Sequence, residues 1–288
     1  MAEISAAMVM KLRKMSGQGM MDCKTALQDT DGDVEKALDL LRKKGLATLA
    51  KRAGRDTSEG LVVSKISPDG KTAALVTLCC ETDFVAKSDD FVTTAKILAD
   101  VALACQADEG IENILETSTD SGKFSDIMTQ LVSKTGEKTQ VGDYAKYRLD
   151  GPGLISTYIH FNEKVGTMVQ IEASDEAIAD GDLLKQTASD IAMHITATKP
   201  LALDKDQIDP ETVEREKAIF AEQIKNKPAN IIDKIVEGKI NKFYAENCLL
   251  QQPFVKDDSR TVEQVLADAA KQAGGEAKIK RFARFEVG

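Results

Sequence analysis

The chain has 288 residues and a formal net charge of -9, because 47 Asp and Glu side chains outnumber 38 Lys and Arg. Such an acidic balance repels the phosphates of nucleic acids over most of the surface, so we expect no direct nucleic-acid binding. The sequence has no apolar run of about 18 residues, and its N-terminus lacks the basic and apolar segments of a signal peptide. These features predict a cytoplasmic protein that does not use a membrane, with room for two domains.

The cysteines and histidines argue against the common kinds of enzyme and metal site. The five cysteines are scattered without a CxxC pair, which is typical of reduced, buried thiols rather than of disulfides or a zinc site. Cys79 and Cys80 are adjacent, but on the strand expected there their side chains point to opposite faces. The chain has two histidines, and the HExxH, GxSxG and Walker A patterns are absent from its sequence. We therefore expect no metal site, no cofactor and no enzymatic catalysis.

Residues 1–54 are predicted to form three short helices in a small bundle. Ser5 is a suitable N-cap for the first helix, and the second covers about residues 21–28. Asp33 precedes the third helix, which we expect to end at Gly45. A bundle of this kind resembles the ubiquitin-associated fold.

Two further features of this bundle bear on binding. Met20 and Met21 lie in the glycine-rich loop before the second helix, and flexible methionine side chains fill irregular grooves well. We expect one of them to contact a partner and the other to close the core. Basic residues concentrate within 42–55, where a solvated helix end is a better explanation than an RNA-binding surface.

After the bundle, one pattern occurs twice: a β-hairpin followed by a helix. The turn residues and alternating apolar runs support both hairpins. Two more helices are expected within residues 108–137, and an extra strand over 139–150. We place a first core subdomain in residues 55–139 and a second in 140–288. The first hairpin is predicted at 60–66 and 72–80, and its helix is expected to start near Ser88 or Asp89, which suit an N-cap. The second hairpin is predicted at 154–161 and 165–173 with its helix over 182–195.

An antiparallel helical hairpin is expected within the second subdomain, over about residues 205–248. Pro210 suits the start of its first helix, and Lys227 and Pro228 form the turn between its two helices. A helix over 261–272 and a strand over 278–287 follow. The sequence therefore predicts an α+β fold, with a three-helix bundle, two related hairpin-plus-helix subdomains and an inserted helical hairpin.

Residues 81–85 place an acid and an aromatic side chain where the first hairpin leads into its helix. In a connection this short, Phe84 either packs into the core or points outward as an anchor for a partner. On this motif alone the core is favoured, because apolar residues that flank helices usually pack inside.

Four separated segments resemble the elongation factor Ts family, in the family's order along the chain. They are residues 12–27, Thr82-Asp83-Phe84-Val85, Val236-Glu237-Gly238-Lys239 and Gln252-Pro253-Phe254-Val255. The resemblance implies a guanine nucleotide exchange factor that binds elongation factor Tu with GDP during translation elongation. It also implies that Phe84 wedges between helices of elongation factor Tu beside its magnesium site, with Thr82, Asp83 and Val85 fixing the geometry. Magnesium is then displaced and GDP leaves.

The same resemblance implies that Leu12, Met20, Met21 and His160 contact elongation factor Tu. His160 lies near the end of the second hairpin's first strand, which we take as the counterpart of the approach to Asp83 in the first. The turn that follows, at 161–164, is longer and less rich in glycine than is usual in the family.

The assembly and the far end of the chain are less defined. A homodimer and a 2:2 complex with elongation factor Tu are both left open. Some family members carry a further C-terminal helix that grips elongation factor Tu, and this sequence ends at Gly288, where that helix would begin. We therefore do not carry over the contacts of that helix.

Two other expectations complete the analysis. His194 lies at the inner end of an amphipathic helix and is expected to be structural. The alternative function is that of a ubiquitin-associated-type adaptor or scaffold without exchange activity. That alternative would explain residues 1–54, but neither Thr82-Asp83-Phe84-Val85 nor the paired hairpins.

Overall fold

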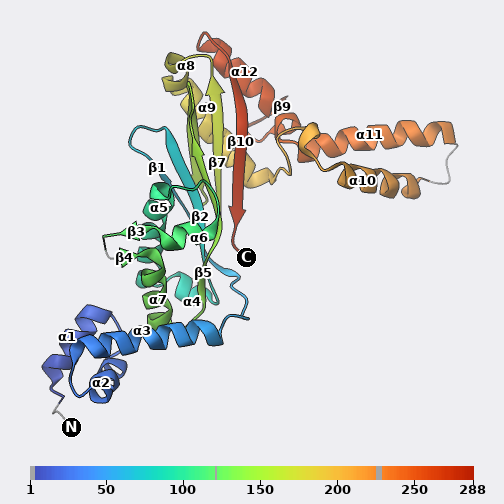
Figure 1. Cartoon of the computed structure of the whole chain (residues 1–288). Coiled ribbons are helices and arrows are strands. Elements are labelled where there is room, and N and C mark those ends of the chain that lie inside the picture. The colour runs from blue at the N-terminus through green and yellow to red at the C-terminus, as the bar shows by residue number, and fades with distance from the viewer. Residues whose placement is uncertain (1–3, 121, 225–228) are drawn as a thin grey trace.

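The computed structural model describes residues 4–120, 122–224 and 229–288. The expected turn at Lys227 and Pro228 lies outside these residues. Figure 1 shows the helical N-terminal bundle at one end of a core of strands and helices, and a pair of helices that projects from that core. The α+β prediction is confirmed.

The N-terminal bundle has the three predicted helices around an apolar core. Ser5 caps the first helix, since its hydroxyl accepts a hydrogen bond from the Met8 N–H at 3.3 Å. Leu12 and Leu27 are fully buried in this core. The helices are α1 (Ala6–Ser16), α2 (Met20–Asp29) and α3 (Val34–Lys51).

The expected end of the third helix at Gly45 is wrong, because α3 continues to Lys51. Gly45 instead lies where α3 packs against α7 (Phe124–Thr135). A Cβ atom at Gly45 would lie 2.8 Å from the Thr129 carbonyl oxygen and 2.9 Å from the Ser133 Cβ. The glycine therefore allows two helices to approach closely, and its weak helix propensity is overridden by that contact.

Two three-stranded antiparallel sheets form the centre of the core. The first has the order β1-β2-β5 and the second β10-β7-β6. The strand expected at 139–150 is β5, and it pairs with β2. It thus belongs to the first sheet, although our division placed residues 140–150 in the second subdomain. The strands are β1 (Glu59–Ile66), β2 (Thr72–Cys80), β5 (Thr139–Arg148), β6 (Gly153–Ile159), β7 (Val165–Ala173) and β10 (Ala277–Glu286).

The two sheets pack on each other and are covered outside by helices. Val62, Leu75 and Met168 lie in the apolar layer between the sheets. Almost every residue of the middle strands β2 and β7 is buried, as expected of strands covered on both faces. The outer helices are α5 (Asp89–Ala104), α6 (Ile111–Glu116) and α7 on the first sheet, and α8 (Glu176–Asp180), α9 (Asp182–Thr198) and α12 (Val262–Gln272) on the second.

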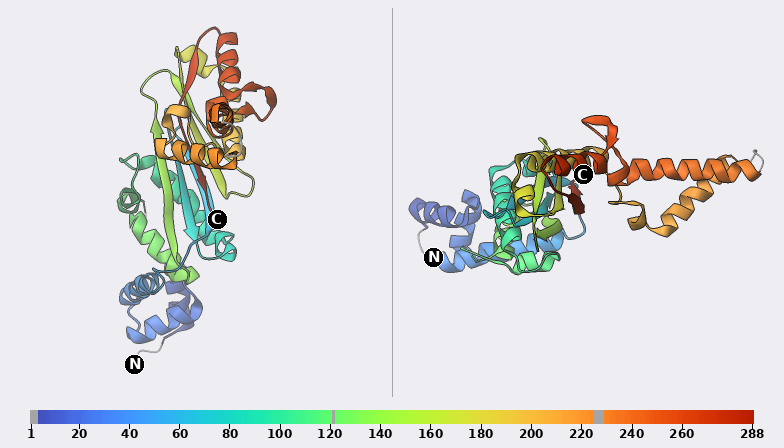
Figure 2. Two further views of the ribbon diagram at one scale, coloured as in Figure 1. Left: turned by 90° about the vertical axis from the view of Figure 1, so that its right-hand side faces the viewer. Right: turned by 90° about the horizontal axis from the view of Figure 1, so that it is seen from above.

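The predicted helical hairpin consists of α10 (Pro210–Gln223) and α11 (Ala229–Asn247). Figure 2 shows it extending from the core on the side opposite the N-terminal bundle. Among the described residues, no helix combines the length and apolar character needed to cross a membrane. The remaining short elements are β3 (Ser118–Thr119), β4 (Gly122–Lys123), β8 (Pro253–Phe254), β9 (Asp257–Thr261) and two 3-10 turns, Lys205–Gln207 and Leu249–Gln251.

The cysteines are free thiols, as predicted, and four of the five are buried. Cys80 lies in the core of the first subdomain, whereas Cys79 packs toward the layer between the sheets. Their side chains therefore point to opposite faces of β2. Burial raises the pKa of the Cys80 thiol to about 12, so it stays protonated and poorly reactive.

Candidate functional site

The connection between the first hairpin and its long helix is a single helical turn, α4 (Asp83–Ala86). Thr82 caps it, because its Oγ1 accepts the Val85 N–H at 3.3 Å and its carbonyl accepts the Ala86 N–H at 3.1 Å. Ser88 then caps α5 through the Phe91 N–H, as the sequence predicted. Two successive caps therefore define the shape of this short segment.

Phe84 points outward from this turn, with 84% of its surface exposed. Successive residues of a helical turn are about 100° apart, so Val85 and Ala86 can pack into the core only if Phe84 lies outside it. The motif taken alone favoured the core for Phe84, and that expectation is wrong. A large exposed aromatic side chain on a fixed backbone is typical of a binding anchor.

Asp83 lies at the first position of the same turn and pairs with Lys87, at 2.7 Å between Oδ2 and Nζ. The hydrogen bond from Lys87 is the main cause of the lowered pKa of the Asp83 carboxyl. An acid in the first turn also suits the positive end of the helix. Asp83 is thus ionised and held beside Phe84 on the surface.

A groove of about 450 Å³ separates α4 from the turn between β6 and β7. Asp83 and Lys87 line one wall, and Asn162, Glu163 and Lys164 line the other. The turn is held in place by the neighbouring strands, since the Glu163 carbonyl accepts the N–H of β1 residue 62 at 2.7 Å. Lys164 forms an ion pair of 2.6 Å with β1 residue 59. The second wall of the groove is therefore tied to β1.

His160 and Phe161 directly precede the three residues of this second wall. The ring of His160 is half-buried, with its Nδ1 3.3 Å from the Tyr158 hydroxyl and its centroid 4.4 Å from that of Phe161. Phe161 is 88% exposed. Phe161 and Phe84 are the two most exposed large apolar side chains among the described residues. In the sequence, Phe161 is predicted only as part of a longer turn, although an aromatic residue beside a candidate contact residue is a usable signal.

The relation that we assumed between His160 and the approach to Asp83 is wrong. His160 follows the first strand of its hairpin, whereas Asp83 follows the second strand of its own. The counterpart of α4 in the second subdomain is α8, which follows β7. The turn after His160 therefore faces α4 across the groove because the two sheets pack together, and the internal repeat does not relate His160 to Asp83.

The bundle presents its methionines at a separate surface. Met20 and Met21 begin α2 and are 44% and 69% exposed. The expectation that one of them closes the core is wrong. Leu12 is fully buried between the helices, so it supports the bundle and does not itself reach a partner. The predicted contact surface of the bundle is thus reduced to the two methionines.

Comparison with known proteins identifies the family. A model of the family described as Elongation factor TS matches residues 81–288. The elongation factor Ts of a Nitratiruptor species is 44% identical over 288 residues, which cover 99% of this chain and 93% of that protein. That of Desulfovibrio desulfuricans is 40% identical over 291 residues, covering 100% of this chain and 99% of that protein. The chain belongs to the elongation factor Ts family. It is therefore a translation elongation factor.

The two late motifs of the elongation factor Ts resemblance have different settings. Residues 236–239 lie on α11 of the projecting hairpin. Gln252 instead accepts hydrogen bonds from His194 Nε2 and Thr198 Oγ1, each at 2.9 Å. His194 Nδ1 accepts the Val255 N–H at 3.2 Å, which leaves the proton on Nε2. Burial lowers the pKa of His194, so the ring is neutral and structural, as predicted.

In this member of the family, four basic residues of segment 42–55 are paired with acids. Arg42 contacts Asp126 on α7, and Lys44 contacts Asp22 within the bundle. The two arginines nearest the end of this segment both form ion pairs with the glutamate directly before Thr82. These cations therefore hold the bundle and its connection to the core.

Proposed function

We propose that this chain is a guanine nucleotide exchange factor that binds elongation factor Tu with GDP, displaces magnesium and releases GDP. The observation that carries the proposal is the exposure of Phe84 on a rigid, doubly capped turn of an elongation factor Ts family member. Its work would take place in the cytoplasm, where translation elongation occurs.

The proposed mechanism is displacement without covalent chemistry. A GTPase holds GDP through a loop around the phosphates and a magnesium ion that neutralises their charge. Insertion of Phe84 between helices of elongation factor Tu shifts these elements, and the magnesium and phosphate contacts weaken together. Thr82 and Val85 hold the turn from inside, whereas Asp83 lies at the surface beside the ring. The magnesium belongs to the GTPase, and this chain supplies no cofactor.

The energies required are within reach of one aromatic side chain. Each tenfold weakening of GDP binding needs about 1.4 kcal/mol of differential contact, and a buried aromatic anchor supplies about 2 kcal/mol or more. If the exchange factor weakens GDP binding to elongation factor Tu by some ratio, thermodynamic linkage requires GDP to weaken the binding of the exchange factor by the same ratio. Phe84 therefore works best if other contacts hold elongation factor Tu while GDP leaves.

Two surfaces are suited to supply that hold. Met20 and Met21 are exposed on the bundle, and His160 and Phe161 directly precede the residues that face α4 across the groove. They lie on different elements, so elongation factor Tu would be held at two places besides Phe84. A 1:1 complex, a homodimer and a 2:2 complex are all compatible with this arrangement.

The test is stopped-flow release of a fluorescent GDP analogue from elongation factor Tu. We expect the wild-type chain to accelerate release and Phe84→Ala to be slower by about tenfold or more. Met21→Ala removes another exposed apolar side chain and is the comparison variant, because Met21 is proposed only to hold elongation factor Tu. No acceleration by the folded wild-type chain would overturn the exchange function and leave the adaptor alternative. Equal acceleration by wild type and Phe84→Ala would mean that GDP release does not depend on Phe84, so the residues that displace GDP would lie outside α4.

A further inference from the structure

Glu81 lies directly before the cap of α4 and joins that cap to the end of the N-terminal bundle. Its carboxylate accepts two hydrogen bonds from Arg52 Nη1, at 2.8 and 2.9 Å, and one from Arg55 Nη1 at 3.0 Å. The backbone N–H of Lys138 donates a fourth, at 2.6 Å. Arg52 and Arg55 follow the last residue of α3, so a single side chain connects α3, α4 and the start of β5.

The neighbouring residues repeat this connection in the opposite direction. The carboxylate of Glu137 accepts the Thr82 N–H at 3.1 Å and the Thr82 hydroxyl at 2.8 Å. Lys138 Nζ donates to the carbonyls of Ala53 and Arg55, at 2.9 and 2.8 Å. Residues 81–82 and 137–138 therefore brace each other, and both are braced against the segment after α3.

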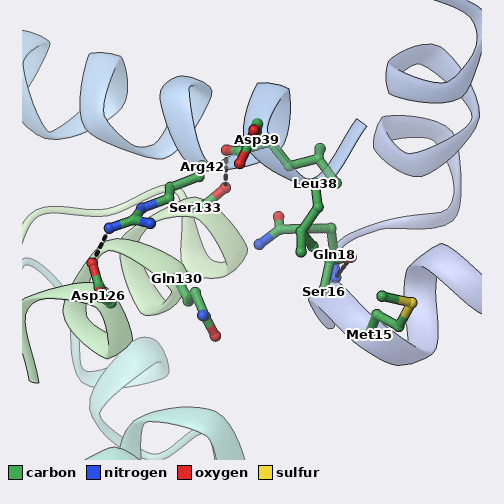
Figure 3. Close-up of a pocket in the computed structure, with 10 residues that line it drawn as sticks. Met15, Ser16, Gln18, Leu38, Asp39, Arg42, Asp126, Gln130 and Ser133 are labelled. Carbon is green, nitrogen blue, oxygen red and sulfur yellow. Dashed lines mark hydrogen bonds and ion pairs between the residues drawn. The ribbon is translucent and has the colours of Figure 1, made fainter. Parts of the chain in front are cut away.

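The middle of α3 is held by α7, the helix that leads into residues 137–138. Figure 3 shows Arg42 of α3 paired with Asp126 of α7, and Ser133 of α7 bonded to α3. Gly45 allows the two helices to touch between these points. α7 ends two residues before Glu137, which bonds to Thr82. Glu81, next to Thr82, bonds back to Arg52 after α3. The contacts therefore form a closed ring that joins α3, α7 and the cap of α4.

The charge of Glu81 suits this role. Its side chain is only 10% exposed and meets two guanidinium groups. Burial opposes ionisation, but the hydrogen bonds from Lys138, Arg52 and Arg55 outweigh it and lower the pKa of Glu81 to about 2. A largely buried carboxylate that accepts four hydrogen bonds from three donor atoms fixes the positions of its partners more strongly than an exposed ion pair does.

We infer that Glu81 is a positioning residue, which fixes α4 and Phe84 relative to α3 so that the bundle and Phe84 engage the GTPase as one rigid unit. This inference rests on the proposed exchange function. Glu81 itself need not touch the GTPase. Loss of its carboxylate would leave both contact surfaces present but no longer in register with each other.

The experiment separates binding from the exchange step. Rates of GDP-analogue release are measured across a range of exchange-factor concentrations for wild type, Glu81→Gln and Arg52→Gln/Arg55→Gln. We expect the maximal rate to fall about fivefold in both variants, with the half-saturating concentration unchanged within about twofold. Glu172→Gln is the matched control, because Glu172 also meets two cations, Lys278 and Lys280, but far from α4. It should keep the wild-type rate.

Amide hydrogen exchange on the free chain provides a second measurement that does not depend on elongation factor Tu. The peptide over residues 81–88 should exchange faster in Glu81→Gln and in Arg52→Gln/Arg55→Gln, and should be unchanged in Glu172→Gln. Unchanged maximal rates and unchanged exchange of this peptide would overturn the inference. A weaker half-saturation with an unchanged maximal rate would also overturn it, since Glu81 would then serve only the hold on the GTPase. Failure of the wild-type chain to accelerate release would instead count against the exchange function.

Discussion

Each half of the core places one short helix between its hairpin and its long helix, and comparison of the two isolates Phe84. Thr82 caps α4 by accepting the Val85 N–H, and Asp175 caps α8 by accepting the Ile178 N–H at 3.0 Å. Val85 and Ile178, three residues after the caps, both pack inward. The same local geometry is therefore used twice in one chain.

The position two residues after the cap is exposed in both helices but differs in size. It is Phe84 in α4 and Ala177 in α8. The α8 turn forms with alanine there, so the fold does not require an aromatic ring at this position. The difference indicates that Phe84 is present for contact with a partner rather than for the fold.

The residue before each cap differs as well. Glu81 connects α4 to the bundle, whereas the described hydrogen bonds of Ser174 join it to Asp175 and to Glu276, the residue directly before β10, within the second half itself. The first half thus has both an exposed aromatic side chain, Phe84, and a carboxylate that ties its short helix to the bundle, Glu81. The second half has neither. Four changes would break or sharpen this comparison.

The largest effect is expected from moving the aromatic ring from α4 to α8. Phe84→Ala/Ala177→Phe keeps the composition and should keep the fold, because both positions are exposed. We expect its GDP release to be about thirtyfold slower than wild type, equivalent to about 2 kcal/mol of lost contact. Ala177→Phe alone should match wild type in the same stopped-flow assay. Recovery of exchange by the double variant would mean that any exposed aromatic residue on the core suffices.

The hydrogen bonds of Glu81 should contribute to the free energy of unfolding, and that contribution should depend on pH. Glu81→Gln should lower the free energy of unfolding by about 1.5–3 kcal/mol near neutral pH, because hydrogen bonds to a charged group are lost. The pKa of Glu81 is lowered from an ordinary 4.5 to about 2, so its contribution is present above pH 4.5 and is lost as the pH falls toward 2. Urea unfolding of wild type and variant at several pH values measures this difference. A difference that stays constant down to about pH 3 would contradict the pKa argument.

A smaller effect is expected at the contact between α3 and α7, which holds the bundle against the first half. Gly45→Ala gains about 1 kcal/mol of helix propensity but forces a Cβ against the Thr129 carbonyl, at a cost of about 2 kcal/mol. The net loss of about 1 kcal/mol is measurable by thermal unfolding. Gly238→Ala on α11 is the control, since a Cβ there meets nothing within 4 Å and should stabilise. Equal stabilisation by both substitutions would disprove the close helix contact.

Features that depend on a few neighbouring residues could be predicted from the sequence. The cap at Ser5, the cap at Ser88 and both hairpins are confirmed. The caps require only a short polar side chain before a helical run, and the hairpins require alternating strands joined by turn residues. The Thr82 motif was located by the same local reasoning, before its geometry was known.

Features that depend on distant packing could not be predicted in the same way. The direction of Phe84 follows from which of its neighbours reach the core, and the continuity of α3 through Gly45 follows from contact with α7. The pairing of β5 with β2 joins strands that are separated by more than fifty residues. The bonds of Glu81 to Arg52 and Lys138 likewise cross 29 and 57 residues. Local propensity carries no information on such contacts.

The smallest effect is expected at Phe161, directly before the residues that line the groove opposite α4. Its ring is 88% exposed and contacts His160 within the chain, so Phe161→Ala should leave the stability of the fold almost unchanged. Binding to nucleotide-free elongation factor Tu, measured by titration calorimetry, should weaken about threefold to tenfold, because a rim aromatic contributes less than a central anchor. Leu201→Ala removes another exposed apolar side chain, 64% exposed, and should leave binding unchanged. Equal affinities for wild type and Phe161→Ala would restrict the proposed contact surface to α4 and the bundle. Weakening of Phe161→Ala beyond that of Phe84→Ala would reverse the comparison and make the β6–β7 turn the principal anchor.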